Sequence, residues 1–178
     1  MLKLPCFKIF FAFIFCMFSS LYPSQVILLM GPSCAGKSTL TKNLYKELHT
    51  IDGTWKTIDL DAVEESIELL IQTTNTFLLN NHNIIIDTNT YENNMEAKFQ
   101  GDPIITKIIV SAPLEILLQR DEERTKKLNR NQEKAYWSRH FVIESFKESH
   151  SWQADLHIDS SLHSSQENCS IILKHLKK

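Results

Sequence analysis

Residues 31–38 of this chain read GPSCAGKS. This stretch meets the pattern GxxxxGK[ST] in full, because Gly31, Gly36, Lys37 and Ser38 stand at the four fixed positions. The glycines of such a loop let backbone N–H groups turn inward, and the following helix adds the positive end of its dipole. Phosphate oxygens then meet a cradle of donors, so the motif predicts a phosphate-binding loop.

The residues of this loop have different expected roles. Lys37 is expected to meet the β- and γ-phosphates of ATP, and Ser38 to reach the accompanying Mg²⁺. The alternative is a glycine-containing turn with an incidental lysine. A strand-like run precedes the motif and a helix-like run follows it, and this context favours the phosphate-binding loop. The other residues expected around the nucleotide are Pro32, Ser33, Cys34, Ala35 and Thr39.

The sequence on either side of the loop alternates short apolar runs with longer amphipathic stretches, which is typical of an α/β layer fold. Residues 25–30 (QVILLM) read as a buried strand, and Leu40, Leu44 and Leu48 mark one face of a helix. Ser164 and Glu167 are spaced as a capping box at the start of a last helix. Further strands are predicted at 55–60, 83–87, 104–111 and 155–159, and further helices at about 62–79, from Pro113, and after Asn131.

Acidic residues follow several of these strands, and an open parallel sheet binds its ligands beyond the carboxyl ends of the strands. After the second strand Asp59 and Asp61 are candidates, and Asp61 suits the carboxylate that orients an acceptor hydroxyl and takes its proton. Asp87, after the third strand, suits the Mg²⁺ shell. Each has a structural alternative: Asp61 with Glu64 fits a helix cap and capping box, and Asp87 fits a turn.

Arg120 and Arg124 stand four residues apart in a charged segment after the fourth strand, and so share one helical face. Guanidinium groups stabilise the charge of a transferring phosphoryl group and stack on adenine. The alternative is a solvated face on which the acids at 121–123 pair with these arginines. The position of the segment favours a lid over the phosphates, by analogy with P-loop kinases.

Composition limits the partners of the chain. Its 178 residues suit one domain, and a net charge of −2 gives no basic face, so no nucleic-acid partner is expected. The four cysteines (Cys6, Cys16, Cys34 and Cys169) form no CxxC pair and read as free thiols, and with the scattered histidines they indicate no metal cage.

From Val26 onward the chain resembles the chloramphenicol phosphotransferase-like family of P-loop kinases. The resemblance implies a three-layer α/β fold with a five-stranded parallel sheet in the order 2-3-1-4-5. It implies that Asp61 activates the acceptor, that Arg120 and Arg124 belong to the lid, and that Ser160 lies near the adenine. The motifs that carry it are GPSCAGKST, Trp55 with Asp61, IIIDT at 84–88, APLEILLQRDEER at 112–124, and ADLHIDSS at 154–161 with SQENCSII at 165–172.

The resemblance also implies the reaction, which is transfer of the γ-phosphate of ATP, with Mg²⁺, to a hydroxyl of a small molecule. The antibiotic-modifying members carry a longer segment between the second and third strands, whereas here 25 residues separate Asp61 from Asp87. That difference argues against chloramphenicol as the acceptor, and the acids Glu64, Glu65 and Glu68 favour a neutral one. The alternatives are a P-loop protein that binds nucleotide without transferring phosphate, and a kinase of nucleotides or nucleosides.

Residues 1–24 are set apart from the predicted kinase domain at 25–178. Lys3 and Lys8 precede ten uninterrupted apolar residues, 9–18, in the length and charge order of a signal peptide or an uncleaved anchor. The run is too short for a comfortable membrane span. Delivery into a host cell and a translation start at Met17 are the alternatives. Membrane contact is expected through this segment alone if it is retained, and the need for ATP favours a cytoplasmic setting.

Overall fold

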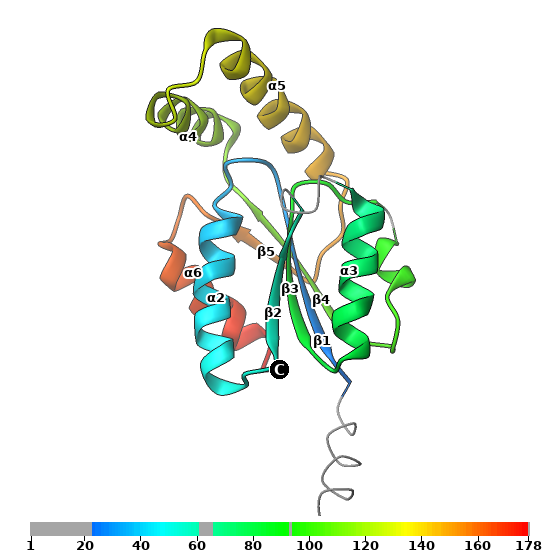
Figure 1. The fold of residues 1–178 in the computed structure, drawn as a ribbon. Helices are drawn as coiled ribbons and strands as arrows, with labels where there is room; N and C mark the ends of the chain where they lie inside the picture. Colours follow the sequence, from blue (N-terminus) through cyan, green and yellow to red (C-terminus); the bar gives the residue numbers. More distant parts are fainter. Residues whose placement is uncertain (1–22, 61–65, 93, 178) are drawn as a thin grey trace, which may run out of the picture.

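The computed structural model describes residues 23–60, 66–92 and 94–177. Its centre is a parallel sheet of five strands in the order β2-β3-β1-β4-β5, with helices on both faces (Figure 1). Both the α/β class and the strand order are as predicted. The elements are β1 Gln25–Met30, α2 Lys37–Ile51, β2 Trp55–Asp59, α3 Ile67–Leu79, β3 Asn83–Thr88, η2 Met95–Lys98, β4 Ile104–Ser111, α4 Leu114–Lys127, α5 Gln132–Ser149, β5 Leu156–Asp159 and α6 Ser165–His175.

The central strand β1 explains why the sheet is covered on both sides. All of its residues after Gln25 are buried, and they alternate between two apolar cores. Ile27 and Leu29 face the core beneath α2 and α6, while Val26, Leu28 and Met30 face the core beneath α3. A continuous apolar run is typical of a parallel strand buried on both faces, so β1 is held firmly where it delivers the chain to residue 31.

Helices α4 and α5 form an arm that projects beyond the carboxyl ends of the strands, over the loop that follows β1 (Figure 1). A buried polar contact joins the two helices: Ser138 of α5 donates to Asp121 Oδ1 of α4 at 2.6 Å, and Asp121 is 3% exposed. Arg130, between the helices, donates to Ser138 Oγ at 2.5 Å. Leu117 of α4 and Val142 of α5 are buried in the core beneath α2 and α6, and so attach the arm to the rest of the domain.

The prediction of a helix from about residue 62 is wrong at its start. Helix α3 begins at Ile67, because Ser66 adopts an extended conformation and its hydroxyl accepts a hydrogen bond from Leu69 N at 3.2 Å. Asp61 and Glu64, the predicted cap, lie outside the described residues. The capping box of Ser164 and Glu167 is confirmed at the start of α6. Within the described residues no helix combines the length and apolarity needed to cross a membrane.

Candidate functional site

The predicted phosphate loop runs from β1 into α2 and depends on unusual backbone angles. Gly31 has φ +149°, and a Cβ there would lie 1.9 Å from the carbonyl oxygen of Val110 on β4. Gly36 has φ +90° and stands at the N-cap of α2. Cys34 also has a positive φ, +65°, which costs a non-glycine residue energy. The loop therefore packs so closely on β4 that glycine is required at position 31.

Lys37 lies across this loop with its side chain 7% exposed. Its Nζ donates hydrogen bonds to Gly31 O at 2.9 Å and to Pro32 O at 3.0 Å. Helix α2 carries no side-chain cap at Gly36 and no acid in its first turn, so the positive end of its dipole is not compensated by its own side chains. A fixed ammonium group and a helix N-terminus thus favour an anion at the same place.

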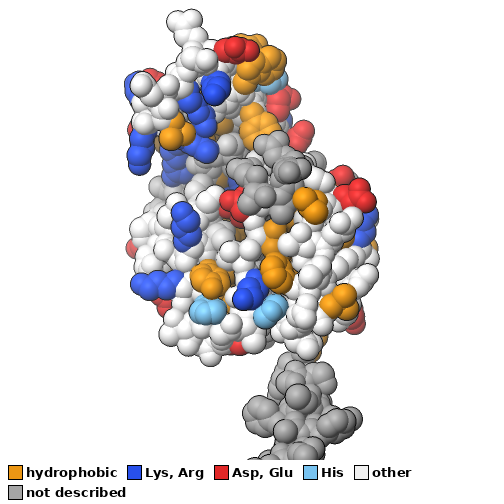
Figure 2. All heavy atoms as spheres, viewed as in Figure 1, with side chains coloured by type: hydrophobic (Ala, Val, Ile, Leu, Met, Phe, Trp, Pro, Cys, Tyr) orange, Lys and Arg blue, Asp and Glu red, His pale blue; other side chains and the backbone are white. Residues whose placement is uncertain are grey.

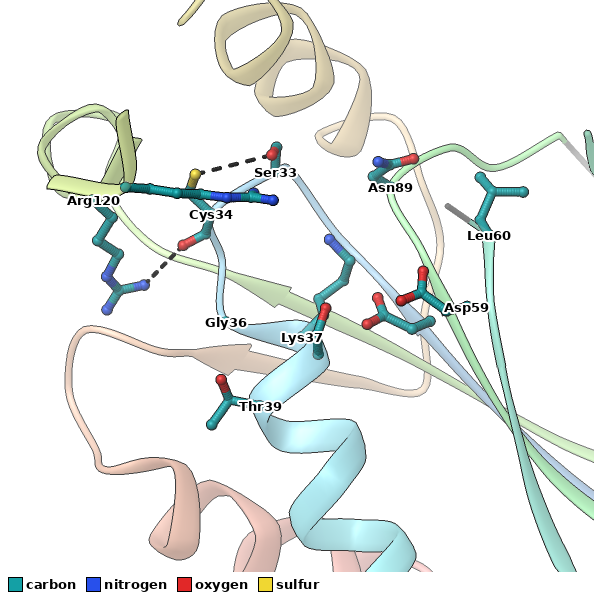
Figure 3. Close-up of a pocket in the computed structure, with 12 residues that line it drawn as sticks. Ser33, Cys34, Gly36, Lys37, Thr39, Asp59, Leu60, Asn89 and Arg120 are labelled. Atoms are coloured by element: carbon teal, nitrogen blue, oxygen red, sulfur yellow. Dashed lines mark hydrogen bonds between the residues drawn. The ribbon is translucent and has the colours of Figure 1, made fainter. Parts of the chain in front are cut away.

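A cavity of about 340 Å³ lies beside Lys37, at the carboxyl ends of the strands (Figure 3). Its wall comes from the loop, the start of α2, the ends of β2 and β3, and α4. Loop residues that the sequence predicts around phosphates thus share one hollow with both predicted lid arginines. The lining residues are Ser33, Cys34, Gly36, Lys37, Ser38, Thr39, Asp59, Leu60, Asp87, Asn89, Arg120 and Arg124.

Two carboxylates face this cavity from neighbouring strands. Asp59 of β2 and Asp87 of β3 are paired in the register of the parallel sheet, and Asp87 pairs in turn with Leu29 of β1. In Figure 3 the side chain of Asp59 points from the end of β2 toward Lys37. Asp61, the predicted acceptor base, lies two residues beyond β2 and outside the described residues.

The oxygen groups in the cavity fit a magnesium ion. Ser38 contributes a hydroxyl, and Asp59 and Asp87 contribute carboxylates, which are the hard ligands that Mg²⁺ prefers. In the described part of the chain no cluster of three or more His, Cys, Asp or Glu residues could hold a metal by itself. Mg²⁺ is commonly bound by one or two carboxylates together with substrate phosphates, which matches this donor set.

The two predicted lid arginines have different surroundings. Arg120 donates to Cys34 O at 3.3 Å, to Ser160 Oγ at 2.9 Å and to Ser160 O at 2.9 Å. It therefore joins the phosphate loop to the turn after β5. Arg124, one helical turn further on, is exposed and lines the cavity. Arg120 is thus placed to position the loop, whereas Arg124 is the arginine whose side chain faces the cavity from an exposed position.

A second cavity of about 320 Å³ lies on the other side of Arg120. Ser160 lines it, together with His163 and Asn168, which the sequence reasoning missed. Asn168 is 3% exposed; its Nδ2 donates to His163 O at 3.3 Å, while its Oδ1 has no hydrogen-bond partner. The capping box indicated where α6 begins, but not that the helix would present Asn168 at a cavity.

The turn that carries Ser160 is held by its neighbour Asp159. The Ser161 hydroxyl donates to Asp159 Oδ1 at 2.5 Å and the Ser161 N–H donates to the same oxygen at 2.8 Å. These bonds favour the ionised carboxylate and lower the pKa of Asp159. The turn therefore keeps a fixed shape near neutral pH, with Ser160 N bonded to Ser111 O of β4 at 2.7 Å.

The loop is also bonded to the arm, which sequence reasoning did not predict. Ser33 N donates to Ser145 Oγ of α5 at 3.2 Å, and this hydroxyl donates to Phe141 O at 2.8 Å. Cys34 Sγ lies 3.9 Å from Asp121 Oδ1 of α4. Ser145 is 2% exposed, and a serine within a helix gives no sequence signal of such a long-range contact. Movement of the arm would therefore alter the shape of the phosphate loop.

Solved structures with a similar fold include several kinases. The chain matches APE1195 with a TM-score of 0.67 at 15% identity, over 88% of this chain and 97% of that one. It matches a protein assigned as a kinase from Chloroflexus aurantiacus with a TM-score of 0.64 at 17% identity, over 88% and 98%. It matches the APS kinase CysC of Mycobacterium tuberculosis, in complex with AMPPNP and APS, with a TM-score of 0.63 at 13% identity, over 88% and 99%.

Sequence comparison adds one family. No curated protein matches the chain significantly. The family model described as ABC transporter matches residues 17–167, which is most of the chain and includes the phosphate loop. The chain therefore belongs to this family of P-loop NTPases, and its fold is that of the P-loop kinases.

Proposed function

We propose that the protein is an ATP-dependent phosphotransferase that moves the γ-phosphate to a hydroxyl group of a small molecule. The observation that carries the proposal is that one cavity brings together the phosphate loop with Lys37, the paired acids Asp59 and Asp87, and Arg124. A protein that only bound Mg·ATP would need the loop and the acids that hold Mg²⁺, but not an exposed arginine that stabilises the charge of a transferring phosphoryl group.

The two cavities suit the two ends of ATP. The phosphates fit the cavity beside Lys37, and the adenosine fits the second cavity beyond Arg120, so the nucleotide would lie across the loop. Asn168, which lines this second cavity with Ser160 and His163, contributes a polar side chain beside the expected position of the adenine. The guanidinium of Arg120, held by Ser160 and Cys34, offers a flat cationic surface for a base.

The chemistry then needs few protein groups. The acceptor oxygen forms a bond to the γ-phosphorus, and the bond from this phosphorus to the β–γ bridging oxygen breaks. Asp61 receives the hydroxyl proton, and Lys37 with Arg124 stabilises the negative charge on the phosphoryl oxygens. Ser38, Asp59 and Asp87 would hold Mg²⁺, which supplies charge neutralisation for the phosphates when bound.

The resemblance to the chloramphenicol phosphotransferase-like family supports a small hydroxylated acceptor. The short segment between β2 and β3 argues against chloramphenicol itself. A nucleotide or nucleoside kinase is the second candidate. The exposed Arg124 on the cavity favours a nucleotide as its acceptor, because the phosphate of a nucleotide would pair with a guanidinium group. The third possibility is nucleotide binding without transfer.

The test is ATP-dependent phosphorylation of a panel of neutral polyols, antibiotics, nucleosides and nucleotides by the full chain. On an accepted substrate, Asp61→Asn is expected to lower kcat by about a thousandfold with ATP affinity unchanged, because it removes a general base. Asp102→Asn is the matched control, since it neutralises an exposed aspartate before β4, outside both cavities.

The outcomes distinguish the three candidate functions. Unchanged turnover by Asp61→Asn would remove the base assignment. Binding of ATP without transfer to any class of acceptor would support the reading as a nucleotide-binding protein, and a preference for nucleosides or nucleotides would support the second candidate.

A further inference from the structure

The end of the domain opposite the phosphate loop carries exposed apolar side chains, one from each layer of the fold. Ile51 is the last residue of α2, Leu79 the last of α3, and Ile104 the first of β4. Their side chains are 76%, 68% and 53% exposed. Because two of them come from opposite faces of the sheet and one from the sheet itself, they mark a broad surface rather than a groove. We call Ile51, Leu79 and Ile104 the basal face.

The chain enters the domain in the middle of this face. Ile104 N donates to Ser24 O at 2.8 Å, and Ile104 pairs with Gln25 in the register of β1 and β4. The run of ten apolar residues at 9–18, preceded by Lys3 and Lys8, therefore ends a few residues before the point where the basal face begins. Only residues 19–23 separate the end of that run from Ser24, which accepts the hydrogen bond from Ile104.

The basal face is held rigidly by one asparagine. Asn83 Oδ1 accepts from Gln25 N at 2.7 Å, while its Nδ2 donates to Asp52 Oδ2 at 3.1 Å and to Thr54 Oγ1 at 3.0 Å. His82 Nδ1 lies 3.1 Å from Thr54 O. The starts of β1, β2 and β3 are thereby fixed to one another, so the apolar side chains are presented in a fixed arrangement without further ordering.

Cationic side chains accompany the apolar ones. Lys56 near the start of β2 and Lys177 after α6 belong to this end, and Figure 2 shows Lys and His side chains among hydrophobic ones toward the lower part of the molecule. Acids are present as well, but two of them already accept backbone bonds: Asp52 from Thr54 N at 3.0 Å and Asp155 from Lys107 N at 2.8 Å. Asp102 is exposed. Apolar contact, rather than net charge, is the main attraction this face offers.

We propose that the basal face rests on a lipid bilayer surface, continuous with insertion of residues 9–18 into the same leaflet. A helical span needs about 20 apolar residues, so a run of ten would stay on one side of the bilayer as an interfacial anchor. The domain would then remain on the side where Lys3 and Lys8 lie. Since the phosphate cavity is at the carboxyl ends of the strands, it would face away from the membrane and stay open to nucleotide.

The test is flotation of the full chain with vesicles of phosphatidylcholine mixed with phosphatidylglycerol. We expect the full chain to float, and the triple variant Ile51→Asp, Leu79→Asp, Ile104→Asp to lower the partition coefficient about tenfold or more. The matched control is Leu128→Asp, Tyr136→Asp, Trp137→Asp on the arm, where the side chains are 54%, 64% and 59% exposed. This control adds the same charge at the far end of the molecule and is expected to leave the partition coefficient nearly unchanged.

Three flotation results would each overturn the proposal: no flotation of the full chain, equal partition of the basal triple variant and the unchanged chain, or equal losses in the two triple variants. Thermal unfolding of each variant shows whether it folds. Should the basal triple variant be unfolded, Ile51→Asp alone, at the most exposed of the three positions, is compared with Leu128→Asp and is expected to lower partition severalfold. A native protein whose N-terminal mass shows that residues 1–18 have been removed would likewise contradict the anchor.

Discussion

Replacement of Lys37 by alanine is expected to weaken ATP binding by about a hundredfold. The Lys37 side chain is 7% exposed and donates to Gly31 O and Pro32 O, so its charge is held at the loop in a poorly solvated position. Hydrogen bonds to a charged group contribute roughly 1.5–3 kcal/mol each, and 1.4 kcal/mol corresponds to a factor of ten in affinity. Loss of the ammonium group therefore removes a large part of the binding free energy of the phosphates.

The matched control for this substitution is Lys42→Ala. Lys42 lies on the same helix, α2, but is exposed and outside both cavities. Calorimetric titration with AMPPNP and Mg²⁺ measures both variants, and Lys42→Ala is expected to bind as the unchanged chain does. If Lys37→Ala bound AMPPNP as tightly as Lys42→Ala, the loop would not be the phosphate site.

Replacement of Gly31 by alanine is expected to lower the free energy of unfolding by about 3 kcal/mol or more. A Cβ at this position would stand 1.9 Å from Val110 O, a backbone atom of the central sheet that cannot rotate away. The φ of +149° adds strain for any residue with a Cβ. Either β4 or the loop must therefore move, and the cradle for phosphates is lost together with the stability.

Gly53→Ala is the control that shows whether the loss of stability is specific to position 31. Gly53 stands in the turn before β2, where an added Cβ meets no atom within 4 Å. Its substitution is expected to change stability by about 0.5 kcal/mol or less. Denaturant unfolding of the two variants gives the comparison, and similar losses in both would show that the tight contact with Val110 is not what requires glycine at 31.

The fold was predictable because its signals are local or periodic. The apolar run of β1, the period of four along α2 and the capping box of α6 each fix an element within a few residues. The start of α3 was predicted wrongly for the same reason: Asp61 with Glu64 and Ser66 with Leu69 N both offer a cap, and local pattern does not rank them. The strand order came from the family resemblance and not from periodicity.

The site was predictable where residues follow strand ends, and much less so where distant segments meet. Asp59 is the last residue of β2, Asp87 stands one residue before the end of β3, and Lys37 begins α2 after the loop that follows β1, so a parallel sheet must bring them to one edge. The bonds from Arg120 to Ser160 and from Ser33 to Ser145 span 40 and 112 residues, and depend on how α4 and α5 pack. No pattern in the sequence encodes those contacts.

A crystal structure of the full chain with AMPPNP and Mg²⁺ would show directly whether the phosphate loop and the two cavities hold ATP. We expect the β- and γ-phosphates to lie against the backbone amides of residues 33–38 and within hydrogen-bond distance of Lys37 Nζ. We expect the adenine beside Arg120, Ser160 and Asn168, and the γ-phosphate facing Asp59, Asp87 and Arg124. A nucleotide bound elsewhere, or with its phosphates turned away from Lys37, would contradict this binding mode.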